Sequence, residues 1–201
     1  MNAVAADIRV CFVGDSFVAG VGDPEHRGWT GRVCARAAAD GHALTSYNLG
    51  IRHETSADIA ARWQPECARR LRQGEHRHIV FSFGVNDTVM ASDATRIAPE
   101  DSLKNLRSIL GMAARDYNIA MVGPPPVADD ELNLRIDVLS RQFGEICKEL
   151  RVPYLPVFDA LNAKNSIWIR QAAANDGAHP RAQAYAALAQ LVQDWPQWWF
   201  R

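Results

Sequence analysis

Residues 8–17 read I-R-V-C-F-V-G-D-S-F and predict a buried strand followed by a sharp turn. Val10–Val13 is a continuous apolar run with two β-branched residues, which is typical of a strand buried on both faces. Gly14 ends the run, and Asp15 and Ser16 follow at once. In an open parallel sheet, ligands bind just beyond the carboxyl ends of the strands, so the position of Ser16 suits a reactive hydroxyl. The stretch alone fits equally well an ordinary turn in which Ser16 caps the backbone.

Apolar runs alternate with amphipathic segments along the rest of the chain. Strict β-α alternation predicts a parallel sheet with helices on both faces and right-handed crossovers. We find no repeat or linker, so we expect one domain over residues 1–201. The expected strands are 8–13, 43–49, 78–83, 119–122 and 152–157, and the expected helices are 29–40, 55–72, 99–115, 130–150 and 180–193.

Composition narrows the class of protein. The 201 residues include 22 basic and 23 acidic ones, a formal net charge of -1 that gives no reason to expect nucleic acid or an anionic membrane as partner. No apolar run approaches the ~20 residues that span a bilayer, and residues 1–7 do not resemble a secretion signal. The four cysteines are scattered, with no C-x-x-C pair, so we expect reduced thiols and a cytoplasmic location. Nothing in the sequence calls for a cofactor.

Polar or glycine signals follow three of the expected strands, and a fourth precedes the last helix. They are Gly14-Asp15-Ser16, Asn48-Leu49-Gly50, Gly84-Val85-Asn86-Asp87 and Asp176-Gly177-Ala178-His179. The carboxyl ends of parallel strands meet at one edge of the sheet, so we expect these segments to lie together.

Together the four segments supply the groups that acyl transfer requires. A hydroxyl nucleophile needs a base, and the base needs an orienting carboxylate. We therefore predict Ser16 as nucleophile, His179 as base and Asp176 as its partner. The developing oxyanion needs fixed donors, for which we predict the backbone N–H groups of Ser16 and Gly50 and the amide of Asn86. Asp15 and Asp87, beside these positions, are expected to bind loop backbone and hold the shape of the site.

The four segments together resemble those of the SGNH hydrolase superfamily, also called GDSL-type esterases and lipases. Members of this superfamily carry a Ser, a Gly, an Asn and a His in four ordered blocks. Phe17 replaces the leucine usual in the first block, a hydrophobic exchange. The resemblance implies a flavodoxin-like three-layer α/β/α sandwich with strand order 2-1-3-4-5. It also implies a metal-free serine esterase that hydrolyses a small-molecule ester through an acyl-enzyme.

Other motifs fit less well. The nucleophile elbow G-x-S-x-G fails because Val18 stands in place of the second glycine. The dinucleotide fingerprint begins at Gly20-Val21-Gly22 and fails at Glu25. His76 and His78 would share one face of a strand as a potential metal pair, but they lie at the wrong end for the site, so we expect surface histidines.

Several alternatives stay open on the sequence alone. A carbohydrate deacetylase or a thioesterase would use the same residues, and a non-catalytic ligand-binding domain could share the fold. The loops 17–28, 87–98 and 158–175 contain no long apolar helix that could cover a lipid chain, so we expect short-acyl esters. The aromatic tail 195–200 is expected to pack back on the domain, with a contact in a homo-oligomer as the alternative.

Overall fold

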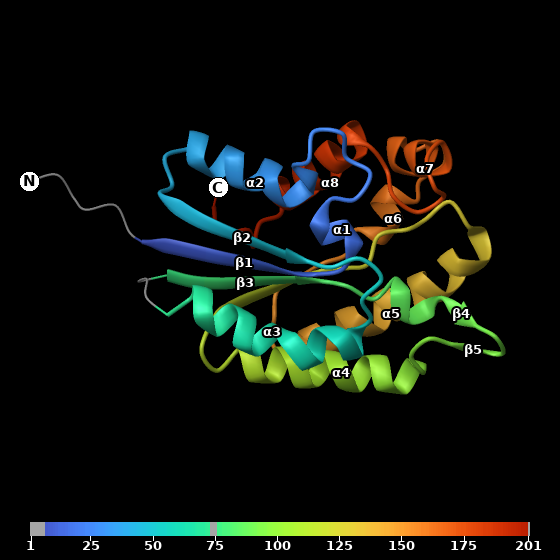
Figure 1. The fold of residues 1–201 in the computed structure, drawn as a ribbon, viewed down its shortest axis with the longest axis horizontal. Coiled ribbons are helices and arrows are strands. Elements are labelled where there is room, and N and C mark those ends of the chain that lie inside the picture. The colour runs from blue at the N-terminus through green and yellow to red at the C-terminus, as the bar shows by residue number, and fades with distance from the viewer. Residues whose placement is uncertain (1–6, 73–75, 201) are drawn as a thin grey trace, which may run out of the picture.

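A five-stranded parallel sheet forms the centre of the protein, in a computed structural model that describes residues 7–72 and 76–200. The strand order, β2-β1-β3-β6-β7, is the 2-1-3-4-5 order that the family resemblance implies (Figure 1). In the register of the sheet, Gly14 of β1 lies between Gly50 of β2 and Ser82 of β3. The strands are β1 (Ile8–Gly14), β2 (Leu44–Gly50), β3 (His76–Ser82), β6 (Asn118–Val122) and β7 (Tyr154–Leu155).

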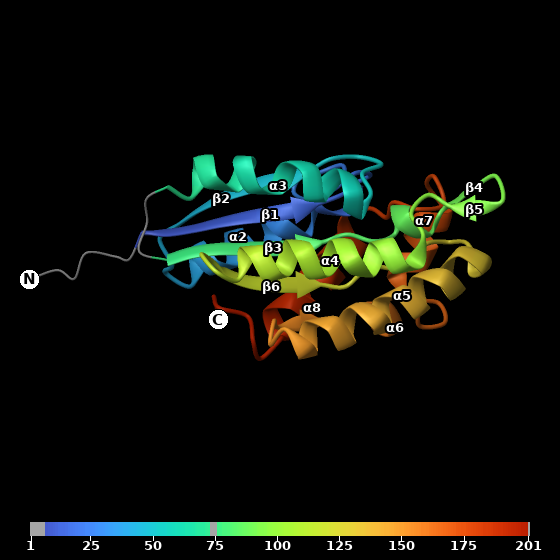
Figure 2. The same cartoon turned by 90° about the horizontal axis from the view of Figure 1, so that it is seen from below.

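The two faces of β1 point into two separate hydrophobic clusters, which makes the fold a three-layer sandwich. Val10 and Phe12 pack toward α2 (Gly28–Ala39) and α8 (Ala182–Asp194) on one side. Cys11 and Val13 point to the other side, which is covered by α3 (Ser56–Arg70), α4 (Pro99–Ala113) and much of α5 (Asp130–Glu149), as Figures 1 and 2 show. All four β1 side chains are buried, as expected of a continuous apolar run in a parallel strand.

Side-chain caps begin the helices that lead away from the carboxyl edge of the sheet. Thr55 and Asp58 form a reciprocal capping box at the start of α3. Asp129 accepts a hydrogen bond from the Leu132 N–H at the start of α5, at 2.9 Å. Pro99 is the first residue of α4, where its missing N–H costs nothing.

The structure departs from the expected elements mainly in the loops. The loop expected after β1 begins with a short helix, α1 (Ser16–Ala19), and the loop 158–175 contains α6 (Phe158–Leu161) and α7 (Ile167–Ala173). Figure 2 shows a hairpin of β4 (Met90–Ala91) and β5 (Ala94–Thr95) projecting beyond the sheet; it follows the 3₁₀ turn η1 (Asn86–Thr88). The strand expected over 152–157 is only β7, because Pro153 and Pro156 flank it and lack N–H donors.

The aromatic tail packs on the protein, as predicted. Trp195, Trp198 and Phe200 are at most 7 % exposed and belong to the cluster on the α2–α8 side. The ring of Trp199 lies 4.4 Å from that of His78, centre to centre. The prediction of a surface histidine is therefore wrong for His78, which is buried under the tail.

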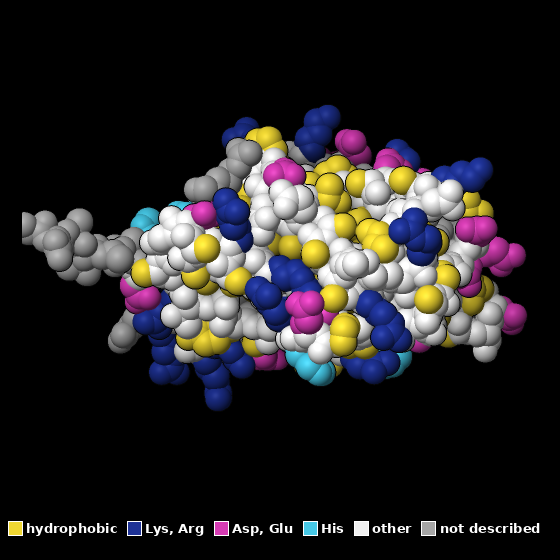
Figure 3. All heavy atoms as spheres, turned by 90° about the horizontal axis from the view of Figure 1, so that it is seen from above, with side chains coloured by type: hydrophobic (Ala, Val, Ile, Leu, Met, Phe, Trp, Pro, Cys, Tyr) yellow, Lys and Arg dark blue, Asp and Glu magenta, His cyan; other side chains and the backbone are white. Residues whose placement is uncertain are grey.

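Charge is spread evenly over the face that carries α2 and α8. Basic and acidic side chains lie scattered among apolar and polar ones on this face (Figure 3), in keeping with the near-zero net charge. Within the described residues, every helix is too short or too polar to cross a bilayer.

Candidate active site

Ser16 is the first residue of α1, directly beyond the end of β1. Asp15 caps this short helix by accepting a hydrogen bond from the Phe17 N–H at 2.9 Å. A Cβ on Gly14 would lie 1.9 Å from the backbone oxygen of Ser82, so only glycine lets β1 and β3 approach this closely at the turn. The buried strand, the glycine and the cap together fix where the Ser16 side chain can go.

His179 and Asp176 reach Ser16 from the segment before α8. The Ser16 Oγ and the His179 Nε2 are 2.8 Å apart, and the His179 Nδ1 and the Asp176 Oδ2 are 2.7 Å apart. Ser16 and His179 are buried, at 4 % and 6 % exposure, so their bond is sheltered from water. The structure thus brings the three residues that the sequence singled out into one hydrogen-bonded chain.

Asp176 also shapes the turn that presents His179. Its Oδ1 accepts hydrogen bonds from the N–H groups of Ala178 (3.0 Å) and His179 (2.7 Å). Partial burial disfavours the charged carboxylate, but the hydrogen bonds from His179 and Ala178 outweigh it and lower the pKa of Asp176 to about 2. The carboxylate is therefore ionised at neutral pH and fixes a hydrogen on Nδ1, which leaves Nε2 free to accept the Ser16 proton.

Asn86 lines the same cavity as Ser16 and is the first residue of η1, the turn after β3. Its Nδ2 donates to the backbone oxygen of Glu54 at 2.9 Å, which leaves a second amide hydrogen for the cavity. The neighbouring Asp87 is buried and accepts from the Ser56 N–H at 2.7 Å. Asn86 and Asp87 therefore tie the turn after β3 to the loop after β2.

Gly50 does not line the same cavity. Its N–H donates to the Asn48 Oδ1 at 2.9 Å, and a Cβ on Gly50 would lie 2.1 Å from the Ala19 N and 2.7 Å from the Asp15 backbone oxygen. The glycine is therefore required for close packing of the end of β2 on α1. Three residues further on, His53 lines the cavity instead.

Ser16, Asn86, Asp176 and His179 open onto a cavity of about 340 Å³. Its walls are largely apolar and come from five separate segments, a composition typical of small-molecule sites. The sequence offered no signal for several of these residues, because they reach the site only through the crossover geometry of the sheet. The remaining wall residues are Phe17, His53, Val85, Val89, Val127, Ala128, Asp129, Leu132, Gly177 and Ala178.

Asp15 is a buried carboxyl next to the candidate nucleophile. Burial raises the pKa of Asp15 to about 7; the Phe17 N–H opposes the shift, and the charges of Asp87 and Glu54 add to it. The bond to the Phe17 N–H is the loop-holding contact expected for Asp15. Asp15 is absent from the walls of the cavity around Ser16.

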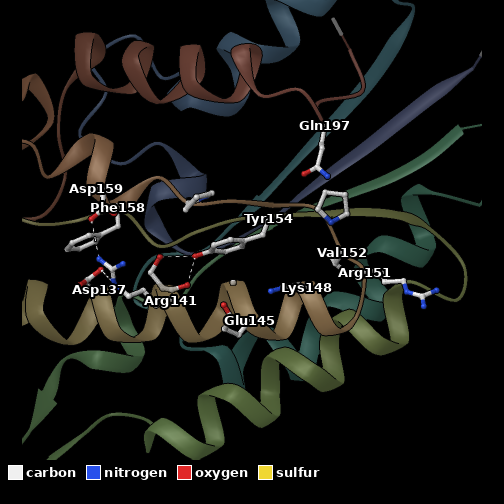
Figure 4. Close-up of a pocket in the computed structure, with 14 residues that line it drawn as sticks. Asp137, Arg141, Glu145, Lys148, Arg151, Val152, Tyr154, Phe158, Asp159 and Gln197 are labelled. Atoms are coloured by element: carbon white, nitrogen blue, oxygen red, sulfur yellow. Dashed lines mark hydrogen bonds and ion pairs between the residues drawn. The ribbon is translucent and has the colours of Figure 1, made fainter.

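A larger cavity of about 770 Å³ lies elsewhere, between α5 and the segment 151–159 (Figure 4). Arg141 is paired there with Asp137 and Asp159, and the Tyr154 hydroxyl donates to the Ser140 backbone oxygen at 2.8 Å. None of the residues that the sequence singled out lines it. Size alone therefore does not identify the functional cavity.

A comparison with known protein families shows where the chain belongs. The chain belongs to the GDSL-like lipase/acylhydrolase family, whose sequence profile matches residues 12–187. This membership confirms the resemblance seen in the four sequence blocks, and it supports a hydrolase of the acylhydrolase class. No sequence among the curated proteins matches the chain.

Solved structures share the fold over almost the whole chain. TesA is 24 % identical, with a TM-score of 0.73 over 92 % of this chain and 96 % of its own. The acetylxylan esterase Axe2 from Geobacillus stearothermophilus is 18 % identical, with a TM-score of 0.75 over 94 % of both chains. A lipase/acylhydrolase from Enterococcus faecalis is 18 % identical, with a TM-score of 0.71 over 92 % of this chain and 93 % of its own. At these identities the likeness establishes the fold.

Proposed function

We propose that the protein is a serine esterase that cleaves short-acyl esters through an acyl-enzyme. The observation that carries the proposal is the continuous hydrogen-bonded chain from Ser16 through His179 to Asp176, at 2.8 and 2.7 Å, at the wall of a cavity. A weak nucleophile becomes reactive when a base within this distance can take its proton. The ionised Asp176 supports the role because it stabilises the imidazolium formed during the reaction.

In the first half of the reaction, the Ser16 Oγ attacks the acyl carbonyl while the His179 Nε2 takes the hydroxyl proton. The carbonyl oxygen becomes an oxyanion, to which the Ser16 N–H and the Asn86 amide donate. The intermediate then collapses, the ester C–O bond breaks, and His179 returns the proton to the leaving alcohol. In the second half, water attacks the acyl-enzyme with His179 again as base, which releases the acid and restores Ser16.

The size of the cavity supports a small substrate. About 340 Å³ lies near the lower end of the range of ~300–1,000 Å³ for ligand pockets. Val89, Val127 and Leu132 give it an apolar lining that suits a short acyl chain. Each further buried methylene would add ~0.8 kcal/mol of binding, so an enzyme with a long acyl tunnel would gain activity steadily with chain length.

A series of p-nitrophenyl esters from acetate to palmitate tests the proposal, measured below and above micelle formation. We expect the highest kcat/KM for short acyl groups and a fall beyond them. Ser16→Ala should abolish turnover, whereas Ser108→Ala, at an exposed serine of α4, should behave as wild type. A preference for the longest chains with a jump at the micellar interface would indicate a lipase, and an inactive protein would favour a ligand-binding domain. Acetylated sugars and thioesters in the same panel separate a deacetylase and a thioesterase from an esterase.

A further inference from the structure

We propose that the backbone N–H of His53 supplies the oxyanion-hole donor that the sequence assigns to Gly50, and that Arg96 is a positioning residue for the His53 peptide. The inference rests on the proposed function, because an oxyanion forms only if Ser16 attacks a carbonyl. It concerns a non-glycine residue in the loop between β2 and α3.

The N–H of Gly50 is already committed. It donates to the Asn48 Oδ1 at 2.9 Å, and that same Asn48 side chain donates through Nδ2 to the Val18 backbone oxygen at 2.7 Å. Gly50 itself packs against the backbone of Ala19 with no room for a Cβ. An oxyanion would have to break the Asn48 bond and enter a packed contact in order to use this donor.

His53 has the properties that Gly50 lacks. It lines the cavity with Ser16 and Asn86. Within residues 7–72 and 76–200, the N–H of His53 and that of Ser16 have no hydrogen-bond partner. Both groups can therefore donate to a bound ligand. Ser16 is buried, where an N–H normally finds a partner, so its open N–H is informative. His53 is exposed, so a ligand in the cavity can displace water from its N–H.

The backbone of His53 is in an unusual conformation. Its φ is +65°, in the left-handed region that a histidine adopts only at a cost. Such residues persist where the surrounding structure holds them, and they gather at functional sites. Here the conformation turns the chain sharply between β2 and α3.

Hydrogen bonds to the backbone oxygens of His53 and Glu54 hold the loop in this conformation. The Arg96 Nη2 donates to the His53 backbone oxygen at 2.8 Å, and the Arg96 N–H donates to the Val89 oxygen, so Arg96 joins the loop to the base of the β4–β5 hairpin. On the following residue, the Glu54 oxygen accepts from the Asn86 Nδ2. The loop therefore carries one proposed donor, His53, and anchors another, Asn86.

A buried ion pair fixes the same loop to the sheet. The Arg62 Nη2 and the Glu54 Oε2 are 2.5 Å apart, and both side chains are about 15 % exposed or less. Arg62 also donates to the backbone oxygens of Leu49 (2.9 Å) and Gly14 (3.2 Å), at the carboxyl ends of β2 and β1. The strand ends that position Ser16 thus also position the loop, which is the preorganisation that an oxyanion hole needs.

Arg96 variants test the positioning role. Arg96→Gln should lower kcat by about tenfold, less than the ~10²–10³ for loss of a donor itself, with little change in KM. Arg96→Lys should recover part of the loss, because an ammonium can still donate to the His53 oxygen. The control is Arg107→Gln on α4, which removes a surface ion pair with Glu149 of α5 and should keep wild-type kinetics. An unchanged kcat in Arg96→Gln at normal thermal stability would overturn the role of Arg96.

A crystal structure of the protein inactivated by a small organophosphonate decides the donor. We expect the phosphoryl oxygen on Ser16 to lie about 2.7–3.1 Å from the His53 N, the Ser16 N and the Asn86 Nδ2. A phosphoryl oxygen bound to the Gly50 N, or one without a contact to the His53 N, would overturn the inference while leaving the proposed function intact. Absence of an adduct on Ser16 would instead overturn the proposed function, and this inference with it.

Discussion

Ser16 and His179 are 163 residues apart in the chain, and their Oγ and Nε2 atoms are 2.8 Å apart in the fold. The distance is short because α1 begins directly after β1, whereas His179 sits in a turn built by Asp176 before α8. Two local structures, each with its own capping carboxylate, are brought together by the sheet. The chemistry we propose depends on this single hydrogen bond.

Asn86→Ala should lower kcat by about 10²–10³ with a small change in KM, because the amide acts on charge that develops only in the transition state. The variant also loses the bond to the Glu54 oxygen, for which we expect a cost of ~1 kcal/mol in stability. Asn105→Ala is the matched control, because Asn105 makes a similar bond to the Ser56 hydroxyl outside the cavity. Steady-state kinetics and thermal unfolding of both variants check this, and a wild-type kcat in Asn86→Ala would refute the role.

Asp176→Asn should lower kcat/KM, because an amide stabilises the imidazolium formed during the reaction less well than a carboxylate does. Asp176, with a pKa of about 2, stays charged over the whole assay range, so its own ionisation adds no step to the pH profile of kcat/KM. Burial raises the pKa of Asp15 to about 7, and the profile is therefore measured in Asp15→Asn as well, where any step that Asp15 causes should disappear. Wild-type kcat/KM in Asp176→Asn would show that Asp176 is not the partner of the base.

Asp15→Asn should change how stability depends on pH. The pKa of Asp15 rises from 3.8 to about 7 on folding, so the folded protein holds this proton more tightly than the unfolded chain. Its contribution is complete below about pH 4 and is lost as pH rises through 7. The Tm of the wild type should therefore fall relative to that of Asp15→Asn between pH 4 and 8, by ~2–4 °C for each kcal/mol lost. Parallel Tm curves for the two proteins would contradict the burial of a protonated Asp15.

Gly50→Ala should destabilise the fold, because its Cβ would lie 2.1 Å from the Ala19 N. Overpacking of this kind costs ~1–3 kcal/mol, which thermal unfolding would show as a clear drop in Tm. Gly111→Ala serves as control, since a Cβ on Gly111 of α4 meets nothing within 4 Å and alanine favours a helix. A Gly50→Ala protein with wild-type Tm would mean that the end of β2 packs on α1 less tightly than described.

The sheet could be predicted from the sequence because its signals are local. Val10–Val13 is apolar at every position because its side chains pack alternately into the hydrophobic clusters on the two faces of the sheet. The β-α alternation then limits the topology, and the observed strand order matches. The strand predicted over 152–157 is shorter in the structure, because Pro153 and Pro156 stop pairing within an otherwise apolar run. The helix α7 escaped because it is only seven residues long, although its Trp168 is buried against Phe17 of α1 and Tyr185 of α8.

The candidate site was predictable only where a residue follows a strand directly or stands next to a helix start. Ser16, Asn86 and His179 meet that condition, and the structure brings them to one cavity. His53 does not meet it, because its place depends on a left-handed turn of a residue type that gives no local sign of one. Gly50 was predicted as a donor because it stands at the end of an expected strand, and in the structure it packs closely on α1.

Covalent labelling of Ser16 tests the central claim most directly. After reaction with an organophosphonate, mass spectrometry of the digested protein should place a single adduct on the peptide that contains Ser16. Ester hydrolysis should be lost in proportion to labelling, and His179→Ala should react far more slowly because its Ser16 hydroxyl has no base. An adduct on another serine, or full hydrolytic activity in a protein whose Ser16 is labelled, would contradict the account.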